Sequence, residues 1–112
     1  MMKQQKKLAR LTIVNQLLEQ LNASVPVERV DIRKLISKAY ATINQPDSTT
    51  KRYQQVPDAI NELNSQFQAI AVAKKYHFSS EQDKLISELT TFTNKMFTRG
   101  WYGLIYMSGI GN

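Results

Sequence analysis

The chain has 112 residues, of which 42% are hydrophobic, a net charge of +6 and no cysteine. This length suits one domain with one modest core, and the apolar content argues against an intrinsically disordered chain. The lack of cysteine excludes disulfides and thiolate metal sites, while the charge indicates either a solubilising surface or attraction to nucleic acid or an anionic membrane leaflet.

Residues 3–22 are expected to form the first helix, because apolar residues recur there at steps of three and four. The stripe consists of Leu8, Leu11, Val14, Leu18 and Leu21, and Ile13 with Leu17 widens it. Its basic start is compatible with a helix lying on a membrane surface, but the apolar face is no wider than a bundle helix needs. The start has no signal-peptide pattern and no stretch reaches the ~18 apolar residues of a spanning helix, so a cytoplasmic location is expected.

A second helix is expected over residues 27–44, after a turn in which Ser24 can cap and Pro26 suits the first helical position. Its apolar stripe is Ile32, Leu35, Ile36, Ala39, Tyr40 and Ile43. Its other faces carry Arg29, Arg33, Lys34 and Lys38. These basic residues can form a solvated face or contact phosphates. Because two acidic residues interrupt them, the solvated face is favoured.

Residues 44–55 predict one long loop, since Pro46, Asp47 and Ser48 are typical of turns. The third helix is expected over 56–75, with Pro57 in its first turn. Its stripe is Val56, Ile60, Leu63, Phe67, Ile70 and Ala71.

The fourth helix is expected over residues 79–99. Ser79 and Gln82 match a capping box, and an apolar stripe follows at Leu85, Leu89, Phe92 and Met96. Lys95 and Arg99 lie in the last turns, where cations favour the helix dipole, and Gly100 ends the helix. Four amphipathic helices joined by short connections predict an all-α, antiparallel four-helix bundle.

The tail, residues 100–112, has no charged side chain and is rich in large apolar residues. These are Trp101, Tyr102, Leu104, Ile105, Tyr106 and Met107. A solvated tail would be polar, so this one must fold back onto the helices, meet a partner or touch lipid. Folding back on the bundle is the expected arrangement. Two alternatives stay open for its aromatic residues. They fill gaps in the bundle, or part of the set faces a partner, where Trp and Tyr are favoured anchors.

Chemistry-bearing patterns are scarce. His77 is the one histidine and has no metal-ligand spacing around it, and no serine lies in a nucleophile elbow. We therefore expect no enzyme activity, no metal and no cofactor. Nucleic-acid binding through a helix-turn-helix is the alternative that composition allows, although the turn before the second helix lacks glycine and no three-helix arrangement is evident.

Two segments carry a family resemblance: KYHFSSEQDKLISEL at 75–89 and RGWYGLIY at 99–106. Their order is basic residue, aromatic, serine, acidic helix start, amphipathic helix and glycine-aromatic tail. In this order, and in length and helix pattern, the chain resembles the enterocin A immunity protein family, the immunity proteins of pediocin-like (class IIa) bacteriocins.

The resemblance implies a cytoplasmic four-helix bundle that protects a Gram-positive bacterium from a pore-forming peptide. Such proteins recognise the bacteriocin-engaged membrane component of the mannose phosphotransferase system from the cytoplasmic side. In the family the C-terminal half sets specificity. The resemblance therefore implies a partner-binding surface with no nucleic acid, peripheral contact with the inner membrane, and a monomer or weak dimer. The hypothetical contact residues are Trp101, Tyr102, Leu104, Tyr106, Lys95 and Arg99. The alternative function is a small basic helical adaptor or nucleic-acid-associated protein.

Overall fold

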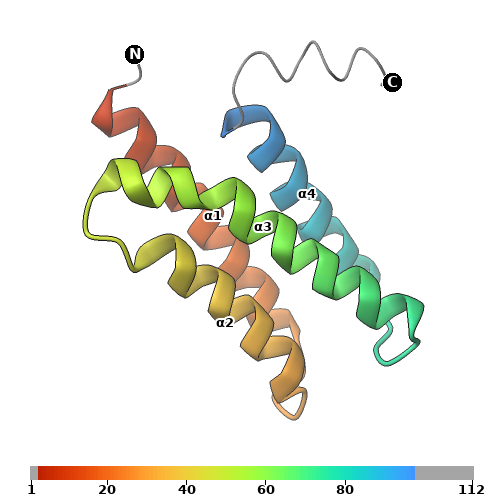
Figure 1. The fold of residues 1–112 in the computed structure, drawn as a ribbon. Helices are drawn as coiled ribbons and strands as arrows, with labels where there is room; N and C mark the ends of the chain where they lie inside the picture. The colour runs from red at the N-terminus through yellow and green to blue at the C-terminus, as the bar shows by residue number, and fades with distance from the viewer. Residues whose placement is uncertain (1–2, 98–112) are drawn as a thin grey trace.

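A computed structural model describes residues 3–97 of the chain. It contains four α-helices: α1 (Gln4–Ser24), α2 (Val30–Asn44), α3 (Thr49–Val72) and α4 (Ser80–Met96). Successive helices run in opposite directions, which confirms the predicted all-α four-helix bundle (Figure 1). The predicted tail over 100–112 and the predicted end of the fourth helix at residue 99 lie outside the described residues.

The helices α1 and α3 form the centre of the bundle. They pack against each other, and both α2 and α4 pack against each of them. The flanking helices α2 and α4 make no contact with each other and lie on opposite sides of the central pair (Figure 1). All four helices thus depend on surfaces provided by α1 and α3.

One continuous core fills the space between the helices. Its completely buried members are Val14, Leu18, Leu21, Ile32, Ile43 and Val56. All six belong to the stripes predicted from the sequence. Leu8 and Ile13, also assigned to the α1 stripe, are instead 42% and 40% exposed, and Tyr40 of α2 is exposed as well. The neighbouring helices cover a narrower face of α1 than the apolar pattern occupies.

The buried face of α4 is rotated relative to the predicted stripe. Leu85 and Leu89 are buried as expected, but Thr93 and Phe97 continue the buried row in place of Phe92 and Met96, which are half-buried. The buried residues of α4 thus recur at steps of four and form the row that packs against α1 and α3. The Thr93 hydroxyl has no hydrogen-bond partner among the described residues.

The predicted loop over residues 44–55 is wrong, because α3 begins at Thr49 and not at 56. Ser48 caps the helix, its Oγ accepting a hydrogen bond from the Lys51 backbone N–H at 3.1 Å. Pro57 therefore lies inside α3, where it cannot donate a bond to the carbonyl four residues earlier. The additional turns remain helical because Tyr53 and Val56 are packed into the core.

The boundary between α1 and α2 also differs from the prediction. Ser24 is the last residue of α1, and its Oγ donates to the Leu21 carbonyl at 2.6 Å instead of capping α2. Pro26 is not the first residue of α2, which begins at Val30. Pro26 instead lies in a turn closed by the Arg29 N–H on its carbonyl at 3.0 Å.

The end of α3 is a Schellman motif without glycine. The Lys74 N–H donates to the Ala71 carbonyl and the Lys75 N–H donates to the Ile70 carbonyl, both at 3.0 Å. This pattern requires a left-handed residue, and Lys74 has φ of 58°. Since a side chain in this conformation is disfavoured by about 1–2 kcal/mol, the turn to α4 is formed under strain.

The capping box at the start of α4 is confirmed. Ser79 Oγ accepts from the Gln82 N–H at 3.1 Å, and Gln82 Oε1 accepts from the Ser79 N–H at 2.9 Å. The side chain of Gln82 is also buried, and its Nε2 donates to the Ser24 carbonyl and to the Tyr76 hydroxyl, both at 3.0 Å. One side chain thus joins the start of α4, the end of α1 and the α3–α4 connection.

Replacement of Lys74 by glycine is expected to stabilise the protein. Glycine adopts positive φ without steric penalty, and the gain is partly offset by greater freedom of the unfolded chain. We expect the free energy of unfolding to rise by about 0.5–1 kcal/mol, measured by urea denaturation. The matched control Lys75→Gly should lower it, and a loss of stability in Lys74→Gly would contradict the role given to this residue.

Replacement of Gln82 by alanine is expected to lower the free energy of unfolding by about 2–4 kcal/mol, because several buried polar groups lose their partner together. The control is Gln66→Ala, since Gln66 is exposed and bonded only to Glu62 of the same helix. Equal urea midpoints for the two variants would show that the Gln82 network contributes little.

Candidate interaction surface at the basic end of the bundle

The antiparallel topology brings three segments together at one end of the bundle. The starts of α1 and α3 lie beside the end of α4, from which the chain continues into the C-terminal tail (Figure 1). We call this region the basic end and define it by its seven cationic residues. These are Lys3, Lys6, Lys7, Arg10, Lys51, Arg52 and Lys95.

The last turn of α4 is fixed by a polar cluster. Arg10 Nη1 donates to the Met96 carbonyl at 2.9 Å and to the Tyr53 hydroxyl at 3.0 Å. The Tyr53 hydroxyl donates to the same carbonyl at 2.6 Å. A carbonyl in the last turn of a helix lacks an intrahelical donor and lies at the negative end of the helix dipole, so a guanidinium is a favourable partner.

Aromatic packing continues this cluster into the core. The ring of Phe97 is buried, with its centroid 4.4 Å from that of Tyr53 and 6.0 Å from that of Phe92. Lys7 lies over the Tyr53 ring, with its Nζ 5.8 Å from the ring centroid and 3.3 Å from Thr50 Oγ1. The point at which the chain leaves α4 is therefore held by contacts with both α1 and α3.

The charge of the basic end is barely compensated. Residues 3–18 contain no carboxylate, and Asp47 is the one acidic residue in the short loop before α3. Among residues 3–97, the single ion pair joins Arg29 and Asp31 at the opposite end, so no described carboxylate forms a salt bridge with a basic-end cation. Since the whole chain has a net charge of +6, this end accounts for the excess of positive charge.

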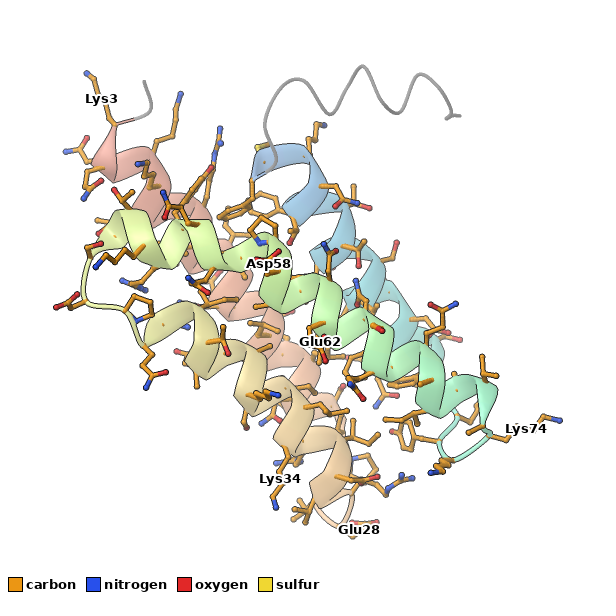
Figure 2. All side chains as sticks on the ribbon, viewed as in Figure 1. Lys3, Glu28, Lys34, Asp58, Glu62 and Lys74 are labelled. Carbon is orange, nitrogen blue, oxygen red and sulfur yellow. The ribbon has the colours of Figure 1, made fainter. Side chains whose placement is uncertain are left out.

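The opposite end carries both signs of charge. Figure 2 shows Glu28, Lys34 and Lys74 there, whereas Lys3 projects from the basic end. Arg29 contacts Asp31 at 2.9 Å and lies over the Tyr76 ring at 4.7 Å. The hydrogen bond from Arg29 lowers the pKa of Asp31. The contribution of this pair to the stability of the fold is therefore present at neutral pH and is lost as pH falls through that lowered pKa.

The residues predicted as a contact surface are only partly described. Lys95 is exposed in the last turn of α4, at the basic end, as expected for a cation near a helix C-terminus. Arg99 and the tail residues Trp101, Tyr102, Leu104 and Tyr106 lie outside the described residues.

Sequence reasoning missed Arg10, Tyr53 and Phe97. The apolar stripe predicted for the first helix does not include Arg10, and Tyr53 lies in the predicted loop over residues 44–55. The contacts among these groups span 43 and 86 positions along the chain, so no local pattern indicates them. The basic N-terminal segment is the one sequence feature that indicates a cationic site here. Its position beside the end of α4 depends on the topology and cannot be read from the sequence.

Two grooves lie elsewhere on the bundle. One of about 280 Å³ runs between α2 and α3, past Lys38, Asp58 and Glu62, the last two of which face outward from α3 in Figure 2. The other, about 230 Å³, lies between α1 and α2 beside Tyr40. Within residues 3–97 there is no group of three or more potential metal-ligating His, Asp or Glu residues. None of the described helices combines the length and apolarity needed to cross a bilayer.

Comparison of the chain with protein-family models, with curated proteins and with solved structures found no match.

Replacement of Tyr53 by phenylalanine is expected to lower the free energy of unfolding by about 1–1.5 kcal/mol. The ring packing is retained, while the Met96 carbonyl and Arg10 lose the hydroxyl. Tyr40→Phe is the matched control, because its exposed hydroxyl makes only a 3.4 Å contact with Glu19. Urea denaturation of both variants checks this, and a loss no larger for Tyr53→Phe than for Tyr40→Phe would contradict it.

Proposed function

We propose that this chain is a bacteriocin immunity protein. It would protect a Gram-positive cell from a pore-forming pediocin-like peptide by binding the bacteriocin-engaged membrane receptor, the mannose phosphotransferase component, from the cytoplasmic side. The mechanism is occlusion of the pore through protein contact, without catalysis. The proposal starts from the resemblance of residues 75–89 and 99–106 to the enterocin A immunity protein family.

The fold supports this proposal, since a four-helix bundle is the architecture that the resemblance implies. The observation that most supports the proposal is the anchoring of the C-terminal end of α4. Arg10 and Tyr53 hold the Met96 carbonyl, and Phe97 is buried beside them. The described part of the chain therefore ends at a fixed point, Phe97, in the most basic region of the bundle. A fixed origin reduces the entropy that an apolar tail loses when it contacts a partner.

In this proposal the tail supplies the specificity surface. Trp101, Tyr102, Leu104 and Tyr106 would provide the apolar anchors, since Trp and Tyr dominate many protein interfaces. Lys95 and Arg99 would lie beside an acidic receptor loop or the inner face of the membrane, where charge complementarity accelerates encounter.

The alternative is a small basic helical adaptor or nucleic-acid-associated protein. The charge of the basic end favours it, but α2, the candidate phosphate-contacting helix, gives it less support. Two arginines near the start of α2 are engaged within the molecule. Arg29 donates to Asp31 and to the Lys75 carbonyl, and both Nε and Nη2 of Arg33 donate to the Val25 carbonyl.

Protection in cells tests the proposed function. The full chain is expressed in a sensitive Gram-positive host, which is then challenged with a panel of pediocin-like peptides. We expect growth against one or a few peptides, and at least a tenfold loss of protection in Trp101→Ala, the size expected for truncation of an interface anchor. Val72→Ala is the matched control, because Val72 is an exposed apolar residue at the far end of α3.

Killing of cells that contain folded protein, across the whole panel, would contradict the immunity proposal. Full protection by a chain truncated after Gly100, with its helical circular dichroism retained, would instead refute the role of the tail alone. Salt-dependent DNA binding together with absence of protection would favour the alternative.

A further inference from the structure

The cations of the basic end differ in how they are used within the molecule. Arg10 is bonded to Tyr53 and Met96, and Arg52 Nη2 donates to Asn44 Oδ1 at 2.7 Å. Lys7 is half-buried and donates to Thr50. The remaining lysines are exposed, and their ammonium groups form no hydrogen bond or ion pair with another residue of 3–97. These are Lys3, Lys6, Lys51 and Lys95.

These four lysines lie at the starts of α1 and α3 and at the end of α4, and the tertiary structure brings them to one end of the bundle. From this arrangement we propose that the basic end binds the surface of a membrane rich in anionic phospholipid. The lysine ammonium groups lie among the lipid phosphates, and the opposite end of the bundle, with Glu28 and Lys74, points away from the membrane (Figure 2). Each lysine at such a surface strengthens binding roughly fivefold.

An exposed apolar side chain lies near the lysines. Leu8 is 42% exposed in the α1 segment that also carries Lys6 and Lys7. Cations with adjacent apolar side chains are what peripheral membrane surfaces require, because electrostatic attraction and shallow burial act together.

A lipid surface fits this end better than nucleic acid does. Bidentate readout of base edges in nucleic acids favours arginines presented as planar forks, and both arginines of the basic end already donate to protein groups. A lysine ammonium on its flexible side chain can interact with an anion from many directions, so lysines adapt to a fluid array of lipid headgroups. The surface is also an end of the bundle rather than an exposed helix face, so it does not present a recognition helix to a groove.

The test uses the purified full chain and vesicles of equal parts phosphatidylglycerol and phosphatidylcholine, with co-sedimentation as the measurement. The variant K3Q/K6Q/K51Q removes three charges from exposed basic-end lysines. The control K34Q/K75Q/K84Q removes three charges from exposed lysines of the opposite end, so both variants have the same net charge. Circular dichroism and urea denaturation establish that both remain folded.

We expect the wild-type chain and the control to bind the anionic vesicles and not vesicles of phosphatidylcholine alone. The basic-end variant should bind on the order of 100-fold more weakly than wild type, from three lysines at about fivefold each. Binding should be lost near 1 M salt, where the Debye length is about 3 Å.

Equal weakening of the two variants would overturn the proposal, because binding would then follow net charge and not the basic end. Absence of wild-type binding to anionic vesicles would overturn it as well. Tighter binding to duplex DNA than to vesicles at the same salt, weakened by K3Q/K6Q/K51Q, would assign this surface to nucleic acid instead.

This inference extends the membrane contact that the proposed function gives to Lys95, and it is argued from the exposed basic-end lysines and from Leu8. Vesicle binding is measured with purified protein, and protection is measured in cells, so the two can fail separately. A chain that protects cells but ignores anionic vesicles refutes the lipid surface and leaves immunity standing. A chain that binds vesicles but gives no protection refutes the immunity proposal and leaves the lipid-binding surface standing.

Discussion

The packing of α1 against α3 is the contact on which the rest of the structure depends. The two flanking helices touch only this central pair, so neither α2 nor α4 has another surface on which to bury its apolar face. Val14 and Leu18 of α1 and Val56 of α3 are among the most completely buried residues of the chain. With no cysteine in the sequence, burial of these stripes is the main source of stability.

Polar side chains that are buried or half-buried fix how the helix ends are joined around this core. At one end Gln82 links the start of α4 to the Ser24 carbonyl, and at the other Arg10 and Tyr53 hold the Met96 carbonyl. Apolar stripes alone allow a helix to slide or rotate by a fraction of a turn. Directional hydrogen bonds to particular carbonyls select one register, because a shifted helix would leave buried polar groups without partners.

The two ends of the bundle differ in how their charged side chains are used. The opposite end is rich in internal contacts, including the Arg29–Asp31 pair and the strained turn at Lys74. At the basic end, Arg10 and Tyr53 hold the last turn of α4. The ammonium groups of Lys3, Lys6, Lys51 and Lys95 form no hydrogen bond or ion pair with another residue of 3–97. Self-repulsion among such charges opposes folding, which agrees with the binding surface that we propose for this end.

The sequence by itself determined the fold class, most of the core and the capping box at Ser79, because helical periodicity and capping are local properties. It misplaced the start of α3, since Pro46 and Pro57 resemble loop boundaries and the packing that keeps Tyr53 helical comes from distant residues. Within the candidate site it identified Lys95 but not Arg10 or Tyr53. Only the tertiary structure decided which cations share one end and which are engaged internally, because these contacts join segments far apart in the chain.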